Sequence, residues 1–119
     1  MTTFEIANRL KEHCSKGEYE IVQRELFAEN ISSIEPMESG LFKKETNGLQ
    51  NIIEKGHKFK TIVEEMHSIA VSEPLVTGNI IAMTLTMDVT MKGQPRQTMG
   101  ELCVYHVKDS KIIKEEFFT

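Results

Sequence analysis

The sequence predicts one α+β domain in which helices of the first half cover a long, twisted sheet formed by the second half. Its length of 119 residues suits a single domain spanning 1–119. Apolar residues recur at helical spacing before Lys60 and alternate with a period of two after it. Helices followed by consecutive hairpin-linked strands indicate an α+β arrangement. The lean hydrophobic share of 39% is typical of a chain with either a cavity or a dimer interface.

Two short helices are expected first. Thr2 or Thr3 can cap the first, and Lys16-Gly17 is a stop signal that ends it. The second helix ends near Asn30, so the two form a hairpin. The apolar stripes of these helices consist of Phe4, Ala7, Leu10 and Cys14, followed by Tyr19, Val22 and Leu26.

The next segment, 31–44, loses periodicity and contains Pro36 and Gly40, which predicts a loop or short strand. A third helix is expected from Thr46 or Gly48 to Phe59. Its apolar stripe is Leu49, Ile52, Ile53, Gly56 and Phe59.

Four strands are expected in the second half, joined by turns rich in Gly, Pro, Asn and Asp. They are Met66–Glu73, Asn79–Met91, Arg96–Val107 and Lys111–Phe118. The second strand carries the clearest pattern, because one of its faces is apolar throughout and the other is half polar. The apolar face consists of Ile81, Met83, Leu85, Met87, Val89 and Met91. This pattern predicts helices over one face and a second copy, in a homodimer, over part of the other.

Composition excludes several classes of function. The net charge is -4 without a basic stripe, which argues against nucleic-acid binding. Glu5 and Arg9 interrupt the N-terminus, so neither a signal peptide nor a membrane span is expected. Cys14 and Cys103 match no metal or redox spacing, and no paired histidines or phosphate-binding glycine loop occurs. We expect a cytoplasmic protein with reduced thiols and neither metal nor cofactor.

Several strings resemble a known family. The runs ANRLKEHCSKGEYEIVQRELFAENISSIEP and VSEPLVTGNIIAMTLTMDVTMKGQPRQTMGELCVYHVKDSKIIKEEFF, with Gly48, resemble the SnoaL-like domains of the nuclear transport factor 2-like superfamily. The resemblance covers Phe4 to Phe118. It implies the cone-shaped, cystatin-like α+β barrel of ketosteroid isomerase and scytalone dehydratase, with helices in the concave face of a mainly antiparallel sheet. Since that superfamily contains isomerases, dehydratases, cyclases and binding modules, the resemblance leaves the activity open.

Proton transfer in such a pocket needs a carboxyl or imidazole whose pKa is shifted towards neutrality. Glu101 is the first candidate, because it lies between Met99 and Cys103 on one strand face. A solvated residue, or one bonded to a neighbouring strand, is the alternative interpretation. Tyr105, on the same face, is a core aromatic or a ligand-binding hydrogen-bond donor.

Two further catalytic candidates are Glu116 and His67. Regular alternation with Phe118 turns Glu116 inward, whereas a bulge would select Glu115 instead. The cyclases that the chain resembles carry an acidic residue at the end of this strand, but here the chain ends in two phenylalanines and a threonine. His67 shares its parity with Ile69, which makes it a core residue or a base.

The remaining candidates would bind a ligand. Glu35 is held extended by Pro36, and the resemblance places it at the pocket mouth. Flexible methionines, either core or pocket wall, are Met83, Met87 and Met99.

These residues favour a cavity for an apolar small molecule, with catalysis undecided. The alternatives are a cofactor-independent isomerase, dehydratase or cyclase that uses pocket carboxylates, and a purely structural or dimerisation module. An enzyme should bring at least two titratable groups into one apolar pocket, with at least one perturbed pKa. A binding module should instead show its glutamates paired with cations at the rim or facing solvent.

Overall fold

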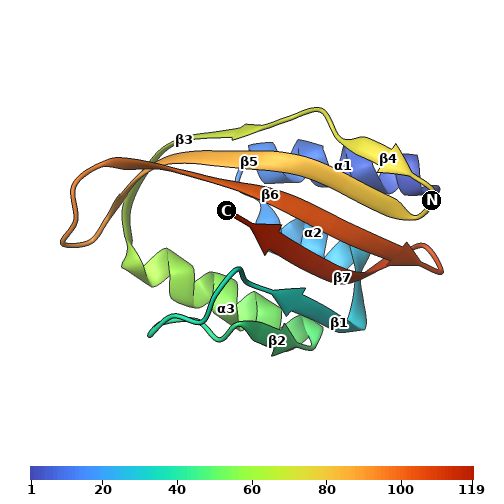
Figure 1. The fold of residues 1–119 in the computed structure, drawn as a ribbon, viewed down its shortest axis with the longest axis horizontal. Helices are drawn as coiled ribbons and strands as arrows, with labels where there is room; N and C mark the ends of the chain where they lie inside the picture. Colours follow the sequence, from blue (N-terminus) through green and yellow to red (C-terminus); the bar gives the residue numbers. More distant parts are fainter.

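A computed structural model describes residues 1–119 and confirms the α+β class. Three helices lie within the curve of one seven-stranded sheet, which curls without closing (Figure 1). The helices are α1 (Thr3–Ser15), α2 (Tyr19–Leu26) and α3 (Leu49–Ile62). The strands are β1 (Phe27–Ile34), β2 (Glu45–Asn47), β3 (Val63–Val71), β4 (Leu75–Thr77), β5 (Ile80–Met91), β6 (Gln97–Lys108) and β7 (Lys111–Phe118). None of these helices is long and apolar enough to cross a membrane.

The helical hairpin begins as expected. The Thr2 hydroxyl accepts from the Glu5 backbone N–H at 3.1 Å, and the Glu5 carboxylate accepts from the Thr2 N–H at 2.8 Å. These reciprocal bonds form a capping box that satisfies backbone donors at the start of α1. Gly17 has φ +72°, which lets the chain turn into α2 without a Cβ clash.

The main difference from the sequence prediction is β1. The predicted second helix ended near Asn30, but α2 ends at Leu26 and Phe27–Ile34 forms a strand parallel to β7. Tertiary pairing overrides local propensity here, because Ile31 and Ser33 are both fully buried in the strand. The sheet is therefore mixed, with order β2-β1-β7-β6-β5-β3 and β4 paired with β5.

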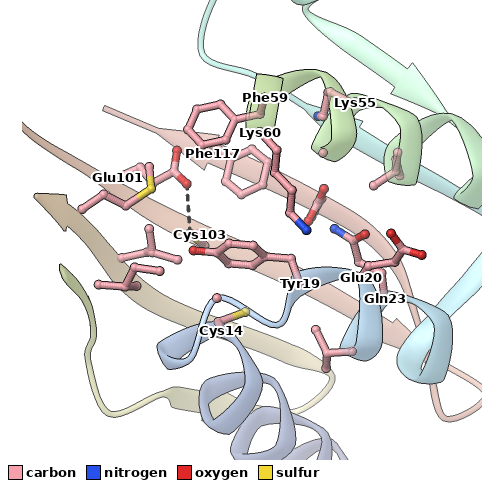
Figure 2. A pocket seen from close by; sticks show the side chains of 18 of the residues that line it. Cys14, Tyr19, Glu20, Gln23, Lys55, Phe59, Lys60, Glu101, Cys103 and Phe117 are labelled. Carbon is pink, nitrogen blue, oxygen red and sulfur yellow. Dashed lines mark hydrogen bonds between the residues drawn. The ribbon is translucent and has the colours of Figure 1, made fainter. Parts of the chain in front are cut away.

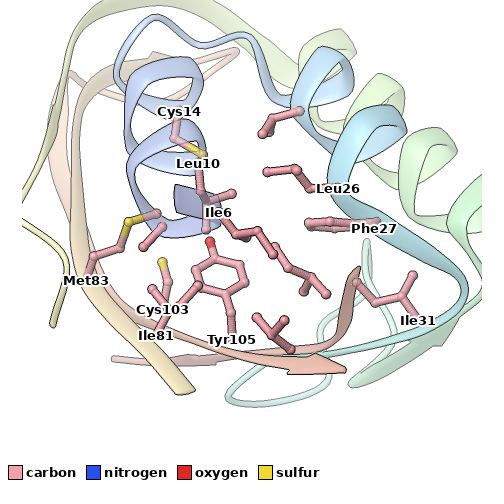
Figure 3. Packing of buried hydrophobic residues seen from close by; sticks show 14 of the residues in the cluster. Ile6, Leu10, Cys14, Leu26, Phe27, Ile31, Ile81, Met83, Cys103 and Tyr105 are labelled. Carbon is pink, nitrogen blue, oxygen red and sulfur yellow. The ribbon is translucent and has the colours of Figure 1, made fainter. Parts of the chain in front are cut away.

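The long β5–β6 hairpin carries the methionine-rich face into the core, as predicted. Ile81, Met83 and Leu85 are at most 5% exposed and pack beneath the helices (Figure 3). The opposite face leaves Leu102 and Phe118 40% and 46% exposed, directly paired between β6 and β7. A homodimer through this outer face stays a prediction.

Two of the bulges in the sheet bear on the predicted site residues His67 and Glu116. In β3, His67 is an extra residue between the pairs Met66–Val89 and Ser68–Asp88. In β7, the register to β6 slips by one residue between Ile112 and Lys114. Each bulge inverts the alternation beyond it, and thereby changes the face to which later residues belong.

Candidate functional site

The helices and the concave face of the sheet enclose a cavity of about 600 Å³. Most of its lining is hydrophobic, and its volume lies within the range of small-molecule sites. Aromatic rings come from α2, α3, the sheet and the loop between β1 and β2. They belong to Tyr19, Phe27, Phe42, Phe59, Tyr105 and Phe117.

Glu101 enters this cavity from β6, where it lies opposite Leu85 of β5. Its one hydrogen-bond partner is the Cys103 thiol, with Sγ 3.8 Å from Oε1 (Figure 2). Burial raises the pKa of Glu101 to about 7, and the negative charges of Glu35 and Glu115 add to the rise. The Cys103 thiol and the Lys55 charge lower this pKa only partly. Near neutral pH, Glu101 is therefore able both to accept and to release a proton.

Glu115 enters from β7 and is 5% exposed. The Ser33 hydroxyl of β1 donates to its Oε2 at 2.7 Å. Burial raises the pKa of Glu115 to about 7, while the Ser33 hydrogen bond and then the Lys55 charge oppose the rise. Glu115 thus has the same pKa as Glu101, but unlike Glu101 it accepts a hydrogen bond from a hydroxyl group.

Lys55 links Ser33, the partner of this carboxyl, to Glu35. Its Nζ donates to Ser33 Oγ at 2.9 Å and to Glu35 Oε1 at 3.0 Å. The ammonium lies 5.8 Å from the centroid of the Phe117 ring. With 16% of its side chain exposed, Lys55 is a nearly buried cation on the cavity side of α3.

Tyr19 supplies a hydroxyl to the same cavity. Its oxygen is buried and has no hydrogen-bond partner. Burial raises the Tyr19 pKa, and the neighbouring groups Cys14 and Glu101 raise it further, so the phenol is neutral and able to donate. Burial also raises the pKa of the Cys14 thiol to about 12, which argues against a nucleophilic thiolate there.

Five predicted site residues line the cavity together. They are Glu35, Met87, Met99, Glu101 and Tyr105. Met83 does not line it, because it is 2% exposed in the core beside Cys103. Glu35 differs from a free loop glutamate in that it is bound by Lys55.

Glu116 does not reach the cavity, contrary to the regular alternation expected for its strand. The β7 bulge turns Glu115 inward and directs Glu116 to the outer face. There its carboxylate lies 3.6 Å from the Lys114 ammonium and its side chain is 30% exposed. The sequence analysis left open that a bulge would turn Glu115 inward instead, and the structure has this bulge.

His67 also lies outside the cavity, because it is the extra residue of the β3 bulge. Its Nε2 is 2.8 Å from Thr90 Oγ1, and its Nδ1 is 2.8 Å from a Glu65 carboxylate oxygen. These partners belong to β3 and β5 rather than to the cavity, so His67 and Glu101 are not brought together.

The sequence reasoning missed three polar residues of the site: Lys55 and Tyr19, which line the cavity, and Ser33, which is fully buried and bonded to Glu115 and Lys55. Lys55 had a usable signal, because it follows Ile52 by three residues and precedes Phe59 by four, within an apolar helix face. Ser33 had none, since its strand was not recognised.

Comparisons with known proteins agree with this architecture. The profile of the SnoaL-like domain family matches residues 1–119. A candidate SnoaL-like polyketide cyclase from Mesorhizobium loti, also labelled a carbohydrate phosphatase, is 31% identical over 100% of both chains, with a TM-score of 0.92. No significant match was found among curated proteins.

Two more distant structures share the fold. A cystatin-like protein of unknown function from Xanthomonas campestris is 16% identical, with a TM-score of 0.83 over 99% of this chain and 90% of the other. A ketosteroid isomerase-like protein from Catenulispora acidiphila, in complex with trimethylamine, is 13% identical, with a TM-score of 0.75 over 99% and 87%. The full-length profile match and the 31% identical relative show that the chain belongs to the SnoaL-like domain family.

Proposed function

We propose that this protein is a cofactor-independent acid–base enzyme that moves a proton on a largely apolar small molecule, with Glu101 as the general base. The observation that carries the proposal is the convergence of Glu101 and Glu115, both with a pKa of about 7, in one apolar cavity. A general base is most effective when its pKa lies near the working pH. This convergence favours an enzyme over a binding module.

Glu101 suits the base role better than Glu115. Its one hydrogen-bond partner is a thiol at 3.8 Å, a long and weak contact, so its carboxylate is available to a ligand. Glu115 already accepts from Ser33 and is almost completely buried. The proposal therefore assigns proton abstraction to Glu101 and a supporting electrostatic role to Glu115.

Tyr19 suits the complementary role of donor. Removal of a proton from carbon beside a carbonyl leaves the C–H electron pair in an enolate, with negative charge on oxygen. A buried O–H without a partner is able to donate to that oxygen and stabilise it. The proton held by Glu101 then returns to another carbon, which completes an isomerisation without any cofactor.

The test is the ring opening of 5-nitrobenzisoxazole, a neutral apolar probe. Glu101 would remove its ring C–H proton, the electron pair would form a nitrile, and the N–O bond would break to release a coloured phenolate. We expect saturable turnover that rises with pH around a midpoint near 7. Glu101→Gln should abolish it, and Glu116→Gln should not, because Glu116 lies outside the cavity.

Absence of saturable turnover in the folded wild-type protein would contradict the proposal. An activity equal in wild type and Glu101→Gln would also contradict it, because a surface base would then be responsible. Either outcome, combined with tight binding of apolar ligands, would favour a binding module.

A further inference from the structure

We propose that the Lys55 end of the cavity is a second ligand subsite, which holds a neutral oxygen acceptor such as a ketone. The ligand would then be an elongated, neutral, mostly apolar molecule with a polar group at each end. This inference rests on the proposed function for the reacting end at Glu101, and it adds the class of molecule that the site selects.

The two polar ends are separated by an apolar middle. Tyr105, Glu115 and Ser33 lie in one row across β6, β7 and β1. Glu101 lies four residues from Tyr105 along β6, which corresponds to roughly 13 Å between their Cα atoms. The intervening row pairs Cys103 with Phe117.

The close-up of the cavity shows what lies between the two ends. In Figure 2 the rings of Phe59 and Phe117 lie between the Glu101 carboxyl and Lys55. A ligand that contacts both ends therefore has to cross an aromatic surface. Flat, rigid, apolar groups suit such a surface because they bury area without losing much conformational freedom.

Lys55 has one hydrogen-bond donor to spare. A lysine ammonium carries three N–H donors, and Ser33 and Glu35 accept from two of them. Because Lys55 lines the cavity, the third donor is available to a ligand there. An acceptor on the ligand would complete the bonding of a cation that is otherwise only partly satisfied.

The charges favour a neutral acceptor over a carboxylate. Glu35 is already paired with the Lys55 ammonium at 3.0 Å, and the Lys55 charge also acts on Glu101 and Glu115. The other charged lining residues, Lys16, Glu20, His57 and Lys60, lie on α2, α3 and the turn before α2. Because Lys55 is already paired with Glu35, its positive charge is largely compensated before a ligand anion arrives.

Three matched biphenyls test this inference by calorimetry, slightly above neutral pH. They are 4-hydroxybiphenyl, its 4'-acetyl derivative and its 4'-carboxylate derivative. The shared phenol would donate to the Glu101 carboxylate, and the variable group would reach Lys55. We expect the acetyl compound to bind roughly tenfold more tightly than the parent, as one good hydrogen bond allows, and the carboxylate to bind more weakly than the acetyl compound.

The acetyl gain is the tighter binding of the acetyl compound relative to the parent. Lys55→Met should remove this gain while the parent still binds. Lys92→Met, in the exposed β5–β6 turn, should preserve the gain. Equal affinity of wild type for parent and acetyl compounds would overturn the subsite. Tighter binding of the carboxylate would overturn the neutral class. Both rankings need only the wild-type protein, so they decide the inference even if Lys55→Met does not fold.

Failure of this inference differs from failure of the proposed function. Glu101→Gln should abolish the ring opening of 5-nitrobenzisoxazole yet keep the acetyl gain, because the gain depends on Lys55. Suppose that Lys55→Met, but not Glu101→Gln, loses the acetyl gain and that the wild-type protein does not open the ring. These results would support the subsite at Lys55 and refute Glu101 as the general base.

Discussion

Glu101 and Glu115 are two carboxyls of one cavity with the same raised pKa and different surroundings. Both have a pKa of about 7, and burial is the largest cause for each. Glu115 accepts a 2.7 Å hydrogen bond from Ser33 and reaches Lys55 through it. Glu101 has a single thiol contact at 3.8 Å. The two groups thus combine the same proton affinity with different freedom to contact a ligand.

A perturbed pKa alone therefore does not identify a catalytic group. A buried carboxyl bound by a hydroxyl is a satisfied part of the structure, whereas one with little hydrogen bonding retains capacity for a ligand. Replacing Glu101 and Glu115 in turn separates the effect of proton affinity from the effect of being free to contact a ligand.

The largest expected effect is on catalysis. Glu101→Gln should lower the rate of 5-nitrobenzisoxazole ring opening by at least about 100-fold, which is the usual contribution of a general base. Glu115→Gln removes a negative charge that raises the Glu101 pKa, so it should make Glu101 a slightly weaker base and lower the rate less than about tenfold. Initial rates across pH would measure both. A greater loss in Glu115→Gln would reverse the assignment.

The next effect is on stability. Both folded-state pKa values lie above the ordinary glutamate pKa of 4.5, so the native state binds more protons than the unfolded state between about pH 5 and pH 7. The free energy of unfolding should therefore fall as pH rises through this window. Glu101 is partly exposed, and its titration depends on that of Glu115. We therefore expect Glu101 to account for a loss of unfolding free energy on the order of 2 kcal/mol.

Urea unfolding of wild type and Glu101→Gln below pH 5 and above pH 7 would measure this loss. The variant should be more stable than wild type above pH 7, because it no longer buries a charge. A lower free energy of unfolding for Glu101→Gln than for wild type above pH 7 would instead mark Glu101 as a member of a structural hydrogen-bond network.

A smaller effect separates the two carboxyls directly. Ser33→Ala removes the hydrogen bond that lowers the Glu115 pKa, so that pKa should rise by about one unit. The Glu101 pKa should change little, and downward if at all, because a protonated Glu115 repels it less. Carbon-13 NMR titration of the glutamate carboxyls would resolve both. Equal upward shifts would mean that Ser33 acts on the whole cavity rather than on Glu115.

Much of the fold follows from local pattern. A helix cap at Thr2 or Thr3 and the apolar alternation of Ile81–Met91 were predicted from the sequence, and the structure has the cap at Thr2 and buries the apolar face. Glu101 was also accessible, because a charged residue between Met99 and Cys103 on one strand face stands out. These features depend on residues close together in the chain.

The rest of the site depends on distant pairing. Phe27–Ile34 becomes a strand only because β7 lies beside it, and this pairing brings Ser33 to Glu115 across 82 positions of sequence. The bulges of β3 and β7 leave no recognisable residue pattern, yet they place His67 outside the cavity and select Glu115 over Glu116. The positions of Ser33 and His67 and the choice of Glu115 over Glu116 therefore depend on how the strands pair, and not on composition.

The smallest expected effect is at Glu116, which tests the register itself. Glu116 is next to Glu115, but its partner is the Lys114 ammonium at 3.6 Å on the outer face, with both side chains at least 30% exposed. Exposed pairs of this kind contribute at most about 1 kcal/mol. Glu116→Gln should therefore leave the ring-opening rate unchanged and shift the urea midpoint only slightly, while Glu115→Gln changes the pH dependence of unfolding. If Glu116→Gln instead removed part of that pH dependence, the β7 bulge would be misplaced, and the inward carboxyl would be the one that regular alternation selects.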